Sequence, residues 1–163
     1  MIVEYQEFEV ELLHERGYST QSTDNVRSYT AEYSDGKPIE ERIFTISCHG
    51  IRVKHTHQER EISSAIFCES AGATTIHEKS FFIDEEKIWI CVCNKIYCLK
   101  LPDLEIEWYG RFDFATIFSI NPLHNDFIIH GELDILRITR EGEIKWRFSG
   151  RDIFVTQSGE DSF

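Results

Sequence analysis

Residues 127–148 read FIIHGELDILRITREGEIKWRF, and the spacing within this stretch indicates the architecture of the C-terminal half. Residues 127–130 are an apolar strand candidate. Gly131-Glu132 follows as a two-residue turn, where Gly in the first position suits a type II′ hairpin. Residues 133–138 return as a second strand. Arg140-Glu141-Gly142 is a turn with Gly where a positive φ is favoured, and residues 143–148 form a third strand. The pattern predicts a three-stranded antiparallel meander.

Residues 88–108, IWICVCNKIYCLKLPDLEIEW, follow the same plan. Residues 88–93 are apolar on both faces, which is typical of a strand covered on both sides. Asn94-Lys95 is the expected turn, and two further strands lead to Trp108. The first two strands match those of the later stretch at an offset of 37 residues, and Trp108 matches Trp146 at 38. We therefore expect two equivalent units.

The later unit resembles a repeat of the quinoprotein-type (PQQ-type) β-propellers. The residues that carry this resemblance are Gly131, Leu133, Leu136, Gly142 and Trp146, while the earlier unit has Asn94 and Leu104 near the two glycine positions. The resemblance implies blade-like sheets with a tryptophan packed between them. No cofactor-binding residue can be matched, so we expect no cofactor.

The fold class predicted is all-β, with antiparallel meander sheets and two propeller-blade-like repeats. Four blades of about 40 residues are the most that 163 residues allow, so an open or non-standard closure is expected. A β-sandwich or a cupin-like barrel is the alternative. We expect a single domain over 1–163. Within it we expect irregular strands over 1–80, blade-like repeats over 81–155 and a flexible tail over 156–163.

The chain is acidic, with 29 Asp and Glu, 17 Lys and Arg and a net charge of −12. Such a field repels phosphate backbones and anionic lipids, which argues against nucleic acid and membrane as partners. A basic protein is the better expectation. The face predicted to bind it comprises Glu4, Tyr5, Glu7, Glu9 and Glu11. Bare sheet edges would also allow a homo-oligomer.

The N-terminal sequence and the pattern of the cysteines indicate the cellular compartment that is expected. The early glutamates interrupt every apolar stretch, so no signal-peptide core is present, and no run reaches the ~20 apolar residues of a membrane span. The five cysteines are odd in number and lie within apolar strand candidates, which indicates packed, reduced thiols. They are Cys48, Cys68, Cys91, Cys93 and Cys98. We expect a cytoplasmic protein.

The best metal candidate is His55, His57 and Glu61, which would share one face of a continuous strand. With Gly50, these residues are somewhat similar to the first motif of the cupins. However, the first spacer is one residue short and the closing Gly is missing. The competing interpretation of the histidines is that they are solvated residues at the end of a strand. Cys91, Cys93 and Cys98 are a second possible metal site, for zinc, but thiols packed in the core are the interpretation favoured for them.

Two other groups of residues carry side chains that could act together. His130 and Glu132 flank Gly131, with His124 in the loop before them, and a His–carboxylate pair can transfer protons. Gly110-Arg111-x-Asp113 and Gly150-Arg151-Asp152 each follow a tryptophan-bearing strand. Arg–Asp pairing that joins one unit to the next is the role expected for them.

No motif names a reaction, and the sequence favours a protein that is not an enzyme. The function predicted is a non-catalytic protein-interaction module with an acidic surface that binds a basic partner. An inhibitor of the immunity type, which blocks a basic toxin, is one concrete form. The alternative is a cupin-like metal-dependent enzyme or small-ligand binder that uses His55, His57 and Glu61.

Overall fold

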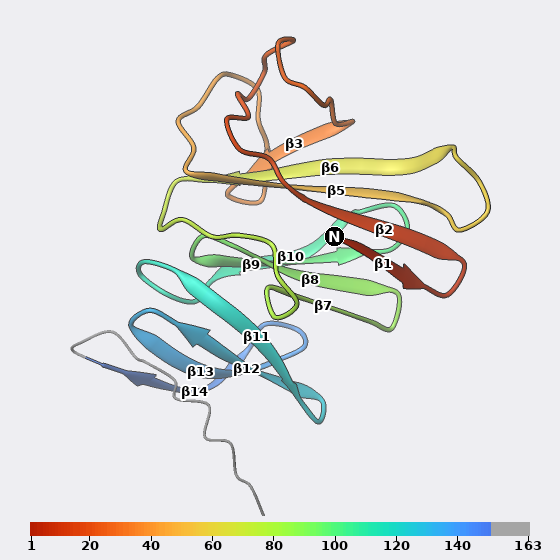
Figure 1. Ribbon diagram of the computed structural model, residues 1–163. Coiled ribbons are helices and arrows are strands. Elements are labelled where there is room, and N and C mark those ends of the chain that lie inside the picture. The colour runs from red at the N-terminus through yellow and green to blue at the C-terminus, as the bar shows by residue number, and fades with distance from the viewer. Residues whose placement is uncertain (151–163) are drawn as a thin grey trace, which may run out of the picture.

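The computed structural model describes residues 1–150, which form three β-sheets and no helix. The sheets stack one on another in chain order (Figure 1). No sheet closes into a barrel within this part of the chain, so the prediction of an all-β fold with open closure is confirmed and the barrel alternative is wrong. The predicted tail, 156–163, lies outside the described residues.

The first sheet has six strands in the order β1-β2-β5-β6-β3-β4. Their bounds are β1 Ile2–Tyr5, β2 Phe8–His14, β3 Ala31–Ser34, β4 Lys37–Pro38, β5 Ser47–His55 and β6 Glu61–Glu69. Strands β1, β2, β5 and β6 form an antiparallel meander. Strand β3 joins β6 in parallel, and Asp35-Gly36, both at positive φ, turn it into β4. The N-terminal half is thus also built around a meander, which the long insertion between β2 and β5 hides in the sequence.

The second and third sheets are four-stranded meanders. The second has β7 Phe81–Asp84, β8 Lys87–Val92, β9 Lys95–Lys100 and β10 Ile106–Arg111. The third has β11 Ile117–Leu123, β12 Asp126–Gly131, β13 Asp134–Thr139 and β14 Ile144–Ser149. Both tryptophan-bearing stretches therefore form three antiparallel strands, as predicted. In each sheet a further strand, β7 or β11, precedes them, and the sequence did not reveal it.

Both predicted hairpin turns are displaced by one residue. Val92 pairs with Lys95, so Cys93-Asn94 is the turn, and Cys93 takes the positive φ. His130 pairs with Ile135, which places the other turn at Glu132-Leu133. Gly131 has no positive φ, so the type II′ assignment was wrong. Gly142 does have one, at +86°, as predicted.

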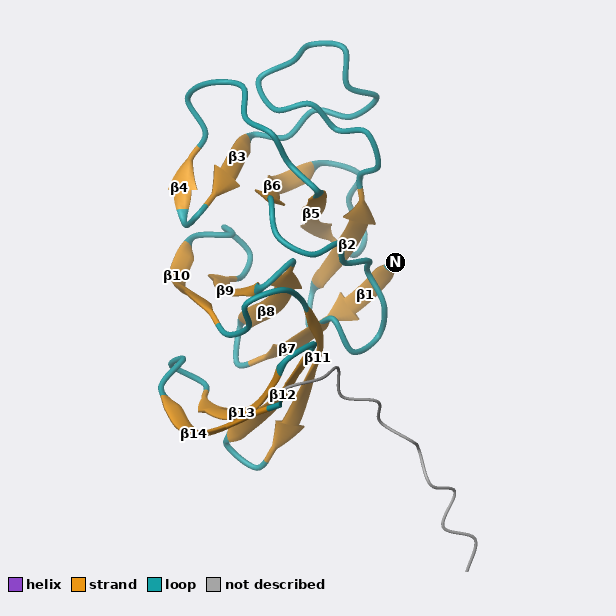
Figure 2. Ribbon diagram, turned by 90° about the vertical axis from the view of Figure 1, so that its left-hand side faces the viewer, coloured by secondary structure: helices purple, strands orange, loops and turns teal. Residues whose placement is uncertain are grey.

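Two apolar cores hold the stack together, and the second sheet contributes to both. Ile88 and Ile90 pack toward the first sheet against Val10, Ile51 and Phe67. The alternate residues of β8, Trp89 and Cys91, pack toward the third sheet against Phe127, Ile129 and Leu136. Burial of the second sheet on both faces agrees with the apolar run in its sequence. The layering is also visible from the side (Figure 2).

Arg140, in the β13–β14 turn, fastens the third sheet to the second. The indole N–H groups of Trp89 and Trp108 donate to its carbonyl oxygen at 3.1 and 3.0 Å. Its guanidinium lies over the rings of Phe82, Trp89 and Phe127, and donates to Asp84 at 2.7 Å. Residues 1–150 include no helix long and apolar enough to span a bilayer.

Candidate functional site

Four turns from the first two sheets meet at one edge of the stack, on the right of Figure 1. The Thr56 N–H donates to the Glu7 carbonyl at 2.9 Å and joins the β5–β6 and β1–β2 turns. The Glu86 N–H donates to the Tyr5 hydroxyl at 3.0 Å, and the Leu101 N–H donates to the Glu86 carbonyl at 2.8 Å. These bonds add the β7–β8 and β9–β10 turns to the group.

Exposed carboxylates are the common feature of these turns and of the adjoining end of β1. We call them the acidic rim, which comprises Glu4, Glu7, Glu59, Glu86 and Asp103. No ion pair joins any of them to another residue within 1–150. The Arg140 guanidinium, on the third sheet, is paired with Asp84 at 2.7 Å and Glu85 at 3.7 Å, next to Glu86 in the sequence. The rim therefore presents exposed negative charge, of which Glu59 also acts electrostatically on Lys54 and helps to raise its pKa.

The five residues of the predicted partner face lie on β1, on β2 and in the turn between them. Glu4 and Glu7 belong to the rim. Glu9 and Glu11 point to the outer face of the first sheet. There Glu9 binds Lys54 at 3.0 Å and raises its pKa, and Glu11 is the cross-strand partner of Arg52. Tyr5 packs on the first apolar core. Glu4 is the cross-strand partner of Glu9, so it shares this outer face with Glu9 and Glu11, whereas Tyr5 points to the opposite side of the sheet.

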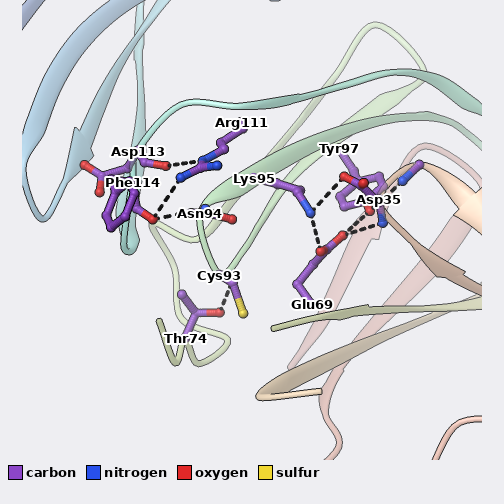
Figure 3. Close-up of polar contacts among 11 residues, drawn as sticks. Asp35, Glu69, Thr74, Cys93, Asn94, Lys95, Tyr97, Arg111, Asp113 and Phe114 are labelled. Atoms are coloured by element: carbon purple, nitrogen blue, oxygen red, sulfur yellow. Dashed lines mark hydrogen bonds and ion pairs between the residues drawn. The ribbon is translucent and has the colours of Figure 1, made fainter. Parts of the chain in front are cut away.

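A polar cleft of about 440 Å³ lies at the opposite ends of the strands, and Figure 3 shows its polar contacts. Buried Glu69 ends β6 in the floor of this cleft. It accepts hydrogen bonds from Lys95 at 2.5 Å, from the Tyr97 hydroxyl, and from the Asp35 backbone N–H at 2.9 Å. Glu69 thereby joins the first sheet to the second.

The charges in the cleft largely compensate one another. Burial lowers the pKa of Lys95, but Glu69 and Asp35, 2.5 and 3.0 Å away, outweigh burial and raise it. Burial, reinforced by Glu69, raises the pKa of Tyr97. The Arg111 guanidinium donates to the carbonyls of Asp113 and Phe114. Lys95 is therefore ammonium and Tyr97 phenol at neutral pH, as in a structural network.

His49 lies behind the cleft and is fully buried. Burial lowers its pKa to about 4, so the ring is neutral at pH 7. Its Nδ1 is 3.2 Å from the Cys91 carbonyl, and its Nε2 is 3.4 Å from Thr74 Oγ1. Its Nε2 also lies 3.3 Å from the Thr74 carbonyl oxygen, so the neutral ring, which has one N–H, can donate to only one of the two carbonyls. Burial raises the pKa of the Cys93 thiol, the reverse of what an activated nucleophile needs.

Asp113 connects the second sheet to the third through backbone groups. Its buried carboxylate accepts the N–H groups of Ala115 at 2.8 Å, Thr116 at 3.3 Å, Leu133 at 3.0 Å and Asp134 at 2.9 Å. Arg111 donates to the carbonyl of Asp113 instead of its carboxylate, so the predicted Arg–Asp pairing is wrong here. The companion pair, Arg151 and Asp152, lies outside the described residues.

Asp113 also accounts for Gly131. A Cβ at position 131 would lie 2.2 Å from the Asp113 carboxylate oxygen. The glycine is therefore required by this close approach, and not by the hairpin turn for which it was proposed.

The proposed metal ligands do not converge. Strand β5 ends at His55, whose ring contacts Phe8, and His57 lies exposed in the following turn. Glu61 lies in β6 and pairs with Arg52 at 3.4 Å. Among residues 1–150, no three His, Cys, Asp or Glu side chains are grouped closely enough to hold a metal ion.

The other singled-out residues have structural positions. All five cysteines are free and buried, as predicted. Burial raises the pKa of Cys91, and burial together with Glu107 raises that of Cys98 to about 12. The His130 ring contacts Phe118 on the outer face of the third sheet. No hydrogen bond or ion pair joins His130 to Glu132 or His124 in the described part of the chain.

Sequence reasoning missed the role of Glu69 and assigned Asp113 a different one. A carboxylate that directly follows an apolar strand, as Glu69 follows residues 65–68, is the available sign of a buried acid.

Comparison with known proteins gave no relative. No protein-family model matches the chain, and no curated protein matches it.

Proposed function

We propose that this protein is a non-catalytic interaction module that binds a basic protein partner through the acidic rim. The observation that supports this proposal best is the gathering of exposed carboxylates from separate turns, none of which has an ion-pair partner among residues 1–150. An immunity-type inhibitor of a basic toxin is one form that such a module takes. We also propose that it acts in the cytoplasm, because five free, buried thiols suit a reducing compartment.

The distribution of charge supports binding on the side of the first two sheets. Residues 1–116 carry a net charge of −9, whereas residues 117–150 carry −1. A one-sided field of this kind raises the association rate with a basic partner and orients it before contact. Glu7, Glu59, Glu86 and Asp103 belong to hydrogen-bonded turns and Glu4 belongs to β1, so the backbone that carries them needs little ordering when a partner approaches.

Charge reversal tests the proposal. The full chain would be immobilised and exposed to lysate of the source cell, with captured proteins identified by mass spectrometry. The test variant is Glu7→Lys/Glu86→Lys. The matched control is Glu40→Lys/Glu41→Lys, which makes the same charge change at exposed residues outside the rim. We expect a basic protein to be captured by the wild type and the control, and lost with the rim variant.

Varying the salt concentration during capture gives a second, independent test of the proposal. The Debye length falls from about 10 Å at 0.1 M to about 3 Å at 1 M, so binding through exposed carboxylates should weaken steeply over that range. Capture that is equal for the rim variant and the wild type, or that is indifferent to salt, would contradict the proposal.

A further inference from the structure

Two thiols of this protein, those of Cys48 and Cys68, lie directly opposite one another. They are cross-strand partners on β5 and β6, and both belong to one apolar cluster on the outer side of the first sheet. The other three cysteines, Cys91, Cys93 and Cys98, lie on β8, on β9 or in the turn between them, and none is the cross-strand partner of another. The first two are therefore the pair whose geometry bears on disulfide formation.

The backbone register brings these two side chains as close together as an antiparallel ladder allows. The Cys48 carbonyl accepts a hydrogen bond from the Glu15 N–H at 2.9 Å, so the polar backbone groups of Cys48 point toward β2 and away from β6. Cys48 and Cys68 are therefore a non-hydrogen-bonded pair, in which the Cα atoms lie about 4.5 Å apart. A disulfide joins Cα atoms that are about 4.4–6.8 Å apart, so the bond can form with both strands in place.

The surroundings of the pair favour the thiolate form of Cys48. A hydrogen bond from the Cys68 thiol lowers the pKa of Cys48, although burial acts in the opposite direction. Thr45 Oγ1, which lies 3.4 Å from Cys48 Sγ, also lowers this pKa. The bond between the thiols, together with burial, raises the pKa of Cys68. Because the thiolate is the form that attacks an oxidant, Cys48 is suited to react first and Cys68 second.

Access to the pair depends on the insertion between β2 and β5, which lies over β5 and β6 in Figure 1. Both thiols are buried beneath residues of this insertion, among them Tyr18 and Tyr29. Residues 40–46, which lead into β5, belong to no strand, and Phe44 within them is 78% exposed. An irregular segment of this kind opens at a lower free energy than the strands of a sheet. Local opening therefore gives a small oxidant a path to Cys48.

We propose that Cys48 and Cys68 form a dithiol site that hydrogen peroxide oxidises to a reversible disulfide between β5 and β6. The Cys48 thiolate attacks one peroxide oxygen, the O–O bond breaks, and the hydroxide that leaves takes up the proton released by Cys48, which becomes a sulfenic acid. The Cys68 sulfur then attacks the Cys48 sulfur, the S–O bond breaks, and the Cys68 proton leaves with the hydroxyl group as water. The two thiols lose two electrons, and the peroxide is reduced to two water molecules. In a reducing compartment, thiol–disulfide exchange restores the pair.

Peptide mass spectrometry of the oxidised full chain tests the proposal. The reduced protein would be treated with hydrogen peroxide in native buffer, freed of peroxide with catalase, alkylated in urea and digested with trypsin. We expect a bridge between the tryptic peptides 43–52 and 61–79, which is absent before oxidation and removed by dithiothreitol. Cys98→Ser is the control and should keep this bridge. Cys68→Ser should instead leave a Cys48 sulfenic acid that dimedone traps.

The wild-type result does not depend on the folding of either variant, and it can overturn the proposal alone. A wild-type chain without the bridge after peroxide treatment, whether its thiols stay free or are oxidised singly, has no such site. A bridge to Cys91, Cys93 or Cys98, or one that forms only when the chain is oxidised in urea, would show that the pairing of β5 with β6 does not direct the reaction.

Discussion

Replacing Asp113 by Ala should cost at least about 3 kcal/mol of the free energy of unfolding. The carboxylate accepts four backbone N–H groups, and two of these bonds, to Thr116 and Asp134, are buried. A buried donor left without an acceptor costs about 1–3 kcal/mol. The two part-buried donors, of Ala115 and Leu133, can turn to water and should add about 0.5–1 kcal/mol each.

Urea unfolding followed by far-UV circular dichroism would measure this cost. Asp113→Asn keeps the shape of the side chain but only one accepting oxygen, so its cost should be intermediate. Asp103→Ala, at an exposed turn, is the control and should stay within about 0.5 kcal/mol of the wild type. The slope against urea should not change, because the surface exposed on unfolding is the same.

A double-mutant cycle makes the test specific to the contact with residue 131. Gly131→Ala alone should destabilise the protein, because its Cβ meets the Asp113 carboxylate. In the Asp113→Ala background much of that penalty should vanish, which gives a coupling energy of about 1 kcal/mol or more. A cost below about 1 kcal/mol for Asp113→Ala, or additive effects of the two changes, would refute the role assigned to the carboxylate.

Three further results are expected. Burial lowers the pKa of His49 in the folded protein, so as the pH falls this histidine is protonated in the unfolded chain at a higher pH than in the folded one. Its contribution to stability is therefore complete above about pH 6.5, and about 2 kcal/mol should be lost between pH 7 and 5 in denaturant titrations, but not in His49→Gln. A thiol reagent at pH 8 should leave Cys91 and Cys98 unlabelled until urea is added; rapid native labelling would contradict their burial. Glu69→Ala should lower the free energy of unfolding by about 3–5 kcal/mol, because it leaves Lys95 buried without its nearest carboxylate. Adding Lys95→Met to this variant should restore part of the lost stability, as measured by thermal unfolding.

The strands of the C-terminal half were predictable because each carries its own local pattern. Apolar alternation located residues 88–108 and 127–148, and a helix was rightly not expected. The offset between corresponding residues of the second and third sheets is larger than the sequence indicated. Phe81↔Ile90 and Ile120↔Ile129 lie 39 residues apart, against the 37 inferred. A difference of two preserves strand alternation, so the faces of the strands were unaffected by the error.

The parts that could not be predicted depend on partners distant in sequence. The meander of the first sheet is interrupted between His14 and Ser47, so adjacent strands are not adjacent in the chain. From the sequence, Gly131 was assigned to a turn. The structure shows that glycine is needed there because the Asp113 carboxylate, 18 positions earlier in the chain, lies too close for a Cβ. The metal hypothesis required β5 to continue through His57, but the chain turns after His55.

The acidic rim is likewise a product of tertiary structure. Glu4 and Glu7 were singled out from composition, whereas Glu59, Glu86 and Asp103 join them only because four turns meet at one edge. Glu9 and Glu11 share a face of the first sheet with Glu4, and there they lie opposite Lys54 and Arg52.

Zero-length carbodiimide cross-linking to the captured partner tests the central proposal most directly, because it joins carboxylates to lysines in contact. The account predicts cross-links from Glu7, Glu86 and Asp103 to lysines of a basic protein, and their loss at high salt. Cross-links confined to Glu40 and Glu41, or a partner without a basic surface, would contradict it.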